Sequence, residues 1–276
     1  MRTIPDPLLR AEAIHNSQTA FICEGRERTF GEFVDRCRRV GSVLDGLRVG
    51  SGERVALLAA NSDTYAELYA GVPSSGRVVV PLNSRWAEPE LAYALEDGAV
   101  TILITDQDPG ELRNSVEQVL SLQEYEDHLS TSEPIEFAQM KEDDLAGLFY
   151  TGGTTGRSKG VMLSHRNLIA NTLHSQITMP LDGEDTYLVV APMFHAAGSN
   201  SVLQCIALGI CQVVVPAFEP NLCLDLIEKH RCSATLAVPT MVAALIEAQA
   251  SNPRDTSSVM LIAHGASPIA TEVLRR

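Results

Sequence analysis

Short apolar runs alternate along this chain with segments whose apolar residues recur at helical spacing. Arg54–Ala59, Val78–Pro81 and Val100–Thr105 are continuous apolar runs of strand length, and helical segments separate them. Strands that alternate with helices form parallel sheets, because each crossover helix returns the chain to the same edge. Apolar runs without polar alternation fit strands that are covered on both faces. We therefore expect an α/β fold of layered, mainly parallel sheets with helices on both faces.

The same rhythm returns after a polar stretch, residues 106–143, in which we expect one or two exposed helices and a connector. We accordingly divide the chain into a first α/β subdomain, 1–140, and a second, 141–276. The later strands are expected at Leu145–Tyr150, Tyr187–Ala191, Gln212–Pro216, Ala234–Val238 and Val259–Ala263. Thr29, Ser62 and Ser164 are the expected helix caps, and Thr29 is followed by Glu32 in a capping-box pattern. Arg276 falls inside an expected helix, so we expect the sequence to be part of a longer protein.

The composition excludes some classes of function. The net charge is −14, which argues against nucleic acid as the main partner, because such binding relies on Lys and Arg neutralising phosphates. The N-terminal residues lack the apolar core of a signal peptide, and no apolar run approaches the roughly 18 residues of a membrane span. The six cysteines form no C-x-x-C pair, so we expect reduced thiols and a cytoplasmic protein rather than a zinc site.

One loop, Thr151–Gly160, has a composition that cannot build a core. It holds four glycines and three threonines, with Arg157 and Lys159 as cations. Glycine lets a ligand approach the backbone closely, and successive N–H groups in such a turn form a concavity that binds anions. The apolar run before it places the loop at the end of a strand. The residues themselves therefore predict a loop that holds phosphates.

Three known patterns were compared with this loop. It does not match G-x-x-x-x-G-K-[ST], and it does not match G-x-G-x-x-G. Gly156–Gly160 does fit G-x-S-x-G, and Ser158 followed by Asp182 or Asp185 and then His195 would give the order of a serine hydrolase. In hydrolases the G-x-S-x-G pattern forms the nucleophile elbow, a sharp turn that leads from a strand directly into a helix. The residues after Gly160 instead favour an extended segment. The hydrolase stays open as an alternative.

Tyr150–Val161 resembles the Y-T-S-G-T-T-G-x-P-K-G-V motif of AMP-forming adenylating enzymes, which include acyl-CoA synthetases, peptide-synthetase adenylation domains and luciferases. Gly152 replaces the usual serine, and Ser158 replaces the usual proline. Three other stretches resemble the family in the same order along the chain, and together they cover nearly all of it. They are Ala59–Ser62 with Val78–Asn83, Pro192–Gly198, and Gly265–Pro268.

The resemblance implies a fold and a reaction. A carboxylate attacks the α-phosphorus of ATP to give acyl-AMP and pyrophosphate, and the thiol of coenzyme A then displaces AMP. The residues implied to hold the β- and γ-phosphates are Thr151, Gly152, Gly153, Thr154, Thr155, Gly156 and Lys159. The residues implied to line the acyl and adenine pocket are His195, Gly265, Ala266 and Ser267. No catalytic residue is assigned. No protein metal site is assigned either, because Mg²⁺ is expected to arrive with ATP.

The expected substrates are therefore ATP, coenzyme A and a carboxylic acid, with a fatty or other apolar acid preferred. The resemblance implies that the family elements that hold magnesium and ribose, and the C-terminal lid domain with its lysine, would lie beyond Arg276. We thus expect this chain alone to show little or no ATP–pyrophosphate exchange. The alternatives are a serine hydrolase that uses Ser158 and a non-catalytic remnant that binds nucleotide. An oligomer is possible.

Overall fold

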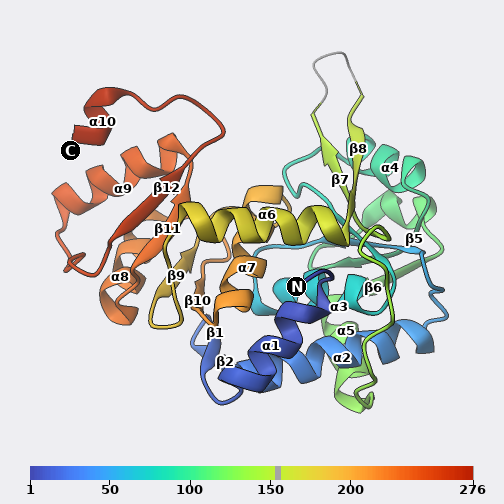
Figure 1. Ribbon diagram of the computed structural model, residues 1–276. Coiled ribbons are helices and arrows are strands. Elements are labelled where there is room, and N and C mark those ends of the chain that lie inside the picture. Colours follow the sequence, from blue (N-terminus) through green and yellow to red (C-terminus); the bar gives the residue numbers. More distant parts are fainter. Residues whose placement is uncertain (153–156, 276) are drawn as a thin grey trace.

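Two six-stranded sheets organise the protein (Figure 1), and the computed structural model describes residues 1–152 and 157–275. The first sheet has the order β6 (Gln118–Ser121), β5 (Val100–Thr105), β3 (Arg54–Leu58), β4 (Val78–Pro81), β7 (Leu145–Thr151), β8 (Lys159–Ser164). The second has the order β12 (Leu261–His264), β11 (Ala234–Ala237), β9 (Thr186–Val189), β10 (Cys211–Val214), β1 (Thr19–Cys23), β2 (Arg26–Thr29). Within the described residues, only the pairs β7–β8 and β1–β2 are antiparallel. The expected fold class, layered and mainly parallel, is confirmed.

Helices cover both faces of both sheets, as the strand side chains show. In β3, Val55 and Leu57 belong to the central core, whereas Ala56 and Leu58 belong to an outer core under α4 (Glu88–Asp97). In the second sheet, Tyr187 and Val189 face the central core while Leu188 faces an outer core. The central layer includes helices α2 (Phe30–Gly46), α3 (Asp63–Ser74) and α7 (Ala196–Leu208). The outer core of the second sheet lies under α8 (Pro220–His230) and α9 (Pro239–Ser251). Alternate side chains of one strand thus pack in different layers.

The remaining elements complete these layers. They are α1 (Pro5–His15), the 3₁₀ helix η1 (Gly110–Ser115), α5 (Leu122–Thr131), α6 (His165–Thr178) and α10 (Thr271–Arg275). No helix among the described residues is long and apolar enough to span a membrane.

The helix starts follow the expected caps. Thr29 accepts the backbone N–H of Glu32 at 3.2 Å, and the Glu32 carboxylate accepts the backbone N–H of Thr29 at 2.8 Å. Ser62 caps α3 through the N–H of Tyr65, and Ser164 caps α6. Each side chain satisfies a backbone donor that the first helical turn leaves free.

Two parts of the sequence reading need correction. The stretch 106–143 is more ordered than expected, because it contains strand β6 and helix α5, whose Tyr125 is fully buried. The sequence reading also missed α1, β1 and β2. The division at residue 140 stays a prediction, but neither sheet follows it. Strands β7 and β8 complete the first sheet, and β1 and β2 complete the second.

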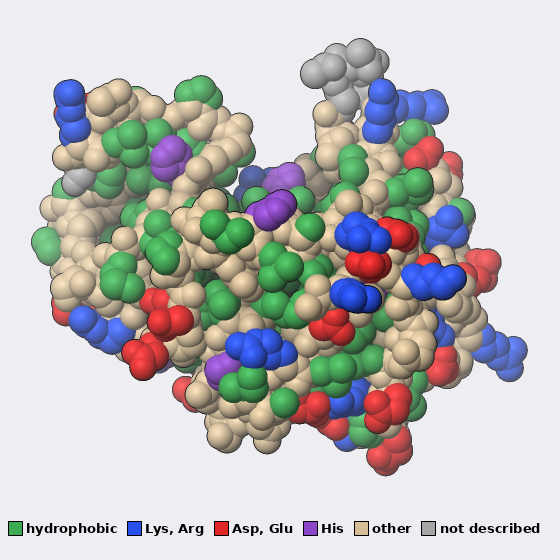
Figure 2. Space-filling view, in the orientation of Figure 1, with side chains coloured by type: hydrophobic (Ala, Val, Ile, Leu, Met, Phe, Trp, Pro, Cys, Tyr) green, Lys and Arg blue, Asp and Glu red, His purple; other side chains and the backbone are tan. Residues whose placement is uncertain are grey.

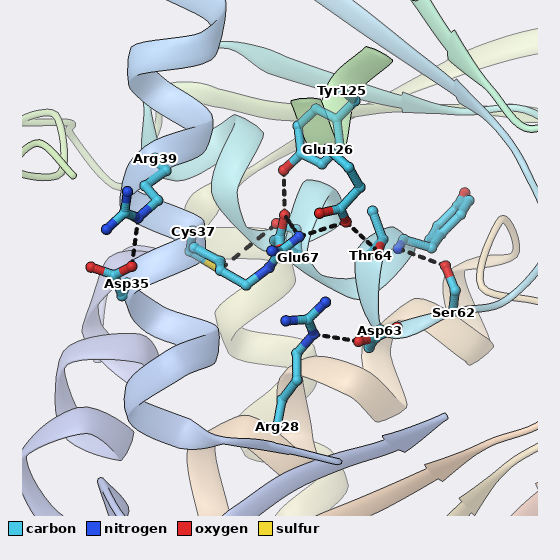
Figure 3. Close-up of polar contacts among 12 residues, drawn as sticks. Arg28, Asp35, Cys37, Arg39, Ser62, Asp63, Thr64, Glu67, Tyr125 and Glu126 are labelled. Carbon is cyan, nitrogen blue, oxygen red and sulfur yellow. Dashed lines mark hydrogen bonds and ion pairs between the residues drawn. The ribbon is translucent and has the colours of Figure 1, made fainter. Parts of the chain in front are cut away.

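A buried polar cluster joins helices α2, α3 and α5 (Figure 3). Glu67 of α3 has no exposed surface and accepts hydrogen bonds from the Arg36 guanidinium of α2 and the Tyr125 hydroxyl of α5. Arg36 also donates to Glu126 at 2.6 Å, and the same Glu126 oxygen accepts from Thr64 at 3.2 Å. A buried carboxylate is tolerated only when its oxygens are paired in this way. The cluster therefore fixes how α2, α3 and α5 pack.

We predict that Glu67→Ala lowers the free energy of unfolding by about 3–5 kcal/mol, because the Arg36 guanidinium loses one of its two carboxylate partners and the buried Tyr125 hydroxyl loses its acceptor. Urea denaturation of the purified chain measures this change. The matched control is Asp35→Ala on the same helix as Arg36. Asp35 pairs with Arg39 and its side chain is 43% exposed, so the expected loss is about 1 kcal/mol or less. Equal losses in the two variants would contradict the assignment.

Candidate functional site

The carboxyl ends of strands from both sheets open onto one cavity of about 810 Å³. Residues that follow β3, β4 and β5 form one side, and residues that follow β9, β10 and β11 form the other. The lining includes Ala59, Ala60, Asn61, Ser84, Arg85, Asp106, Gln107, Val190, Pro192, Phe194, Pro216, Ala217, Phe218, Val238, Thr240 and Met241. Open α/β sheets bind ligands beyond the carboxyl ends of their strands. The cavity has the volume of a small-molecule site.

The molecular surface is hollowed in the view of Figure 2. In Figure 2 the hollow lies between the lobe that carries α10 and the lobe that carries β7 and β8, with histidine side chains along its floor.

The expected phosphate loop joins β7 to β8. Thr151 and Lys159 are paired across the mouth of this hairpin and both are exposed, as is Gly152. Gly153, Thr154, Thr155 and Gly156 lie outside the described residues. Because β7 runs parallel to β4, the hairpin leaves the sheet at the same edge as the cavity. The structure thus places Thr151, Gly152 and Lys159 together at that edge.

Arg157 has a different neighbour. Its guanidinium lies 5.1 Å from the centre of the Tyr93 ring on α4, which is a cation–π distance. Tyr93 in turn donates a hydrogen bond to Asp97 at 3.2 Å. This contact holds Arg157 on the α4 side of the hairpin, next to the loop.

His195 is the N-cap residue of α7 but its side chain makes no capping bond; it is exposed and follows the cavity residue Phe194 without lining the cavity itself. Its ring centre is 4.5 Å from that of Phe194, which lines the cavity. Partial burial and then the positive charge of Arg85 lower the pKa of His195. Among the described residues, no side chain hydrogen-bonds to its ring. The geometry therefore fits a neutral residue next to the cavity wall rather than an acid–base catalyst that a second group orients.

Gly265, Ala266 and Ser267 follow the edge strand β12 and are exposed. Strand β12 is parallel to β11, so this turn also leaves the second sheet at its carboxyl edge. Ala266 has φ +68°, in the left-handed region, which costs a non-glycine residue about 1–2 kcal/mol. The three residues do not line the cavity itself.

Sequence reasoning missed the two charged residues of the cavity. Arg85 follows β4, and among the described residues its guanidinium has no hydrogen-bond or ion-pair partner. Asp106 follows β5 and accepts the backbone N–H of Ala60 at 2.8 Å. Their sequence positions do indicate a site, because each residue comes shortly after a predicted strand, where open α/β sheets bind ligands.

The hydrolase alternative meets a structural difficulty at Ser158. A nucleophile elbow joins a strand to a helix, whereas Ser158 lies between antiparallel strands β7 and β8. Among the described residues, Ser158 has no hydrogen bond to a histidine. The described residues also contain no group of three His, Cys, Asp or Glu side chains that could hold a metal ion.

Close packing at the start of α7 depends on Gly198. A Cβ atom at this position would lie 2.3 Å from the carbonyl oxygen of Pro192 and 3.0 Å from that of Ala191. We predict that Gly198→Ala lowers the free energy of unfolding by about 1–3 kcal/mol, because the backbone of the cavity wall must move. Urea denaturation measures this loss.

Gly265→Ala is the control for this prediction, since a Cβ there meets nothing within 4 Å. A change within about 0.5 kcal/mol is expected for such an open site. An unchanged stability in Gly198→Ala would show that the wall does not need this close approach.

A family model described as AMP-binding enzyme matches residues 9–276. A feruloyl-CoA synthase from Amycolatopsis sp is 33% identical over 88% of this chain and 51% of its own length. A long-chain-fatty-acid–CoA ligase from Bacillus subtilis is 28% identical over 100% of this chain and 57% of its own length. The chain thus spans about half the length of these relatives.

Solved structures agree in fold. A long-chain-fatty-acid–CoA ligase from Archaeoglobus fulgidus superposes with a TM-score of 0.93 at 26% identity, over 100% of this chain and 60% of that one. The N-terminal domain of FACL13 from Mycobacterium tuberculosis superposes with a TM-score of 0.92 at 24% identity, over 100% of this chain and 72% of that one. The resemblance inferred from the loop and the other three stretches is confirmed, and the chain belongs to the AMP-binding enzyme family.

Proposed function

We propose that this chain carries the ATP-holding part of an AMP-forming acid–thiol ligase. In the first step a carboxylate oxygen attacks the α-phosphorus of ATP, and pyrophosphate leaves with the electron pair of the broken P–O bond. In the second step the sulfur of coenzyme A attacks the acyl carbon, and AMP leaves. Both steps need charge stabilisation and alignment more than covalent chemistry by the protein.

Beyond membership of the family, one structural observation supports this proposal. The β7–β8 hairpin and the shared cavity open at the same edge of the first sheet. Thr151, Gly152 and Lys159, with residues 153–156 between them, would bind the β- and γ-phosphates that leave as pyrophosphate. The Lys159 ammonium supplies a point charge, which partly offsets the chain's net negative charge of −14 near a polyanionic ligand.

The acid substrate is proposed to have an apolar body, with a fatty acid preferred. His195 would line the acyl pocket, and Gly265, Ala266 and Ser267 would lie along the adenine and the acyl group. The relatives described above are named for feruloyl and long-chain fatty acyl groups, which supports a carboxylic acid as substrate. Coenzyme A is the proposed thiol, and Mg²⁺ would arrive with ATP.

The proposed compartment is the cytoplasm, where thiols stay reduced. The six cysteines are all free, and five of them are buried.

We predict that the purified chain binds ATP and that Lys159→Ala weakens this binding about tenfold, because a charge-assisted contact to phosphate is lost. Isothermal titration calorimetry with Mg-ATP measures both dissociation constants. The matched control is Lys229→Ala, which removes an exposed lysine on α8, away from the hairpin. The control variant should bind like the parent chain.

The same preparation should show little or no carboxylate-dependent ATP–pyrophosphate exchange, since about half of the relatives' length lies outside it. Equal ATP affinity in the parent chain and in Lys159→Ala would contradict the role of the hairpin. Robust exchange by the 276-residue chain would contradict the division of the active site proposed here.

A further inference from the structure

One side chain crosses from the first sheet to the second at the cavity. Asn61 follows β3, immediately before the cap residue of α3, and is only 7% exposed. Its amide nitrogen donates to the carbonyl oxygen of Ala191 at 3.1 Å and to that of Val215 at 3.3 Å. Its amide oxygen accepts the backbone N–H of Met193 at 2.8 Å. All three partners belong to the second sheet's side of the cavity.

These partners allow a single orientation of the amide. A backbone N–H can only donate and a carbonyl oxygen can only accept, so the oxygen of Asn61 must face Met193 and its nitrogen must face the two carbonyls. Both amide hydrogens and the amide oxygen are used. A side chain this completely paired is held in one rotamer and holds its partners in return.

The three partners occupy critical places in the cavity wall. Ala191 and Met193 bracket the turn after β9 that continues into Phe194 and His195. Val215 is the first residue after β10, and its own N–H donates to Val189 at 3.1 Å. One residue of the first sheet therefore ties together the carboxyl ends of two strands of the second.

We propose that Asn61 is a positioning residue that sets the place of Phe194 and His195 against the cavity. The inference rests on the proposed function only in taking this cavity as the substrate site. Asn61 would not touch the reacting atoms. It would act through segment 191–195, whose backbone it holds at both ends of the turn.

The competing explanation is that Asn61 only stabilises the fold. Thr235 offers a matched comparison, because its buried hydroxyl donates to the carbonyl oxygen of Leu188 at 2.7 Å between β11 and β9. Thr235→Val removes a buried hydrogen bond from the same sheet without a change in side-chain shape. It should lower stability while leaving segment 191–195 as it is.

The test variant is Asn61→Asp, which keeps the size of the side chain and the acceptor for Met193. It loses both donated bonds and sets a carboxylate against the carbonyl oxygens of Ala191 and Val215. Amide hydrogen exchange in segment 191–195 should accelerate about tenfold as its local opening becomes easier. NMR of a chain labelled in its histidine rings should show the His195 resonances shifted.

These readouts separate the two explanations. His195 resonances and exchange rates that match the parent chain in folded Asn61→Asp would overturn the proposal, and so would equal changes in Thr235→Val. If Asn61→Asp does not fold, Asn61→Ser, which leaves room for a water molecule, is measured in the same way. No ATP or acid is present in these experiments, so their failure is distinguishable from failure of the proposed ligase function.

Discussion

Strands β3 and β9 must bury both of their faces, and the rest of the architecture follows from that requirement. Val55 and Leu57 pack into the central core, while Ala56 and Leu58 pack into an outer one. The second sheet divides its side chains in the same way, and it shares the central helix layer with the first. Because one helix layer serves both sheets, their carboxyl edges can border one cavity. A ligand site made from two sheets is thus a consequence of how the apolar faces are covered.

The site combines firmly held and exposed parts. Asn61 and Gly198 fix the wall around Phe194 through hydrogen bonds and close backbone packing. The β7–β8 hairpin, by contrast, presents Thr151 and Lys159 to solvent. This division would suit the proposed ligase site, which has to place an acyl group accurately and admit a highly charged nucleotide.

Local patterns predicted local structure well. The continuous apolar runs located β3, β4 and β5, and Thr29 and Ser62 marked the starts of α2 and α3. Strand β2, whose sequence is Arg-Glu-Arg-Thr, carries no apolar signal because it is an exposed edge strand. Strand β6 is four residues long, too short to stand out inside a polar stretch. Short strands of this kind are defined by their neighbours in the sheet rather than by their own composition.

Contacts between residues far apart in the chain could not be predicted from the sequence for a related reason. The loop's own composition predicted Thr151 and Lys159 as phosphate-binding residues, and that role stays a prediction. Asn61 stood in a stretch that resembles the family, yet nothing local shows that its amide meets carbonyls 130 and 154 residues away. Likewise, the sequence could not show that β1 pairs with β10, which places an N-terminal strand in the second sheet.

The central claim is that segments from both sheets form one acyl-adenylate site. Hydrogen–deuterium exchange of the purified chain, with and without a non-hydrolysable acyl-adenylate analogue, tests it most directly. The account predicts slower exchange in the same complex at three places, namely residues 150–160, 191–195 and 264–268. Protection of one of these segments alone, or of none at saturating analogue, would contradict it.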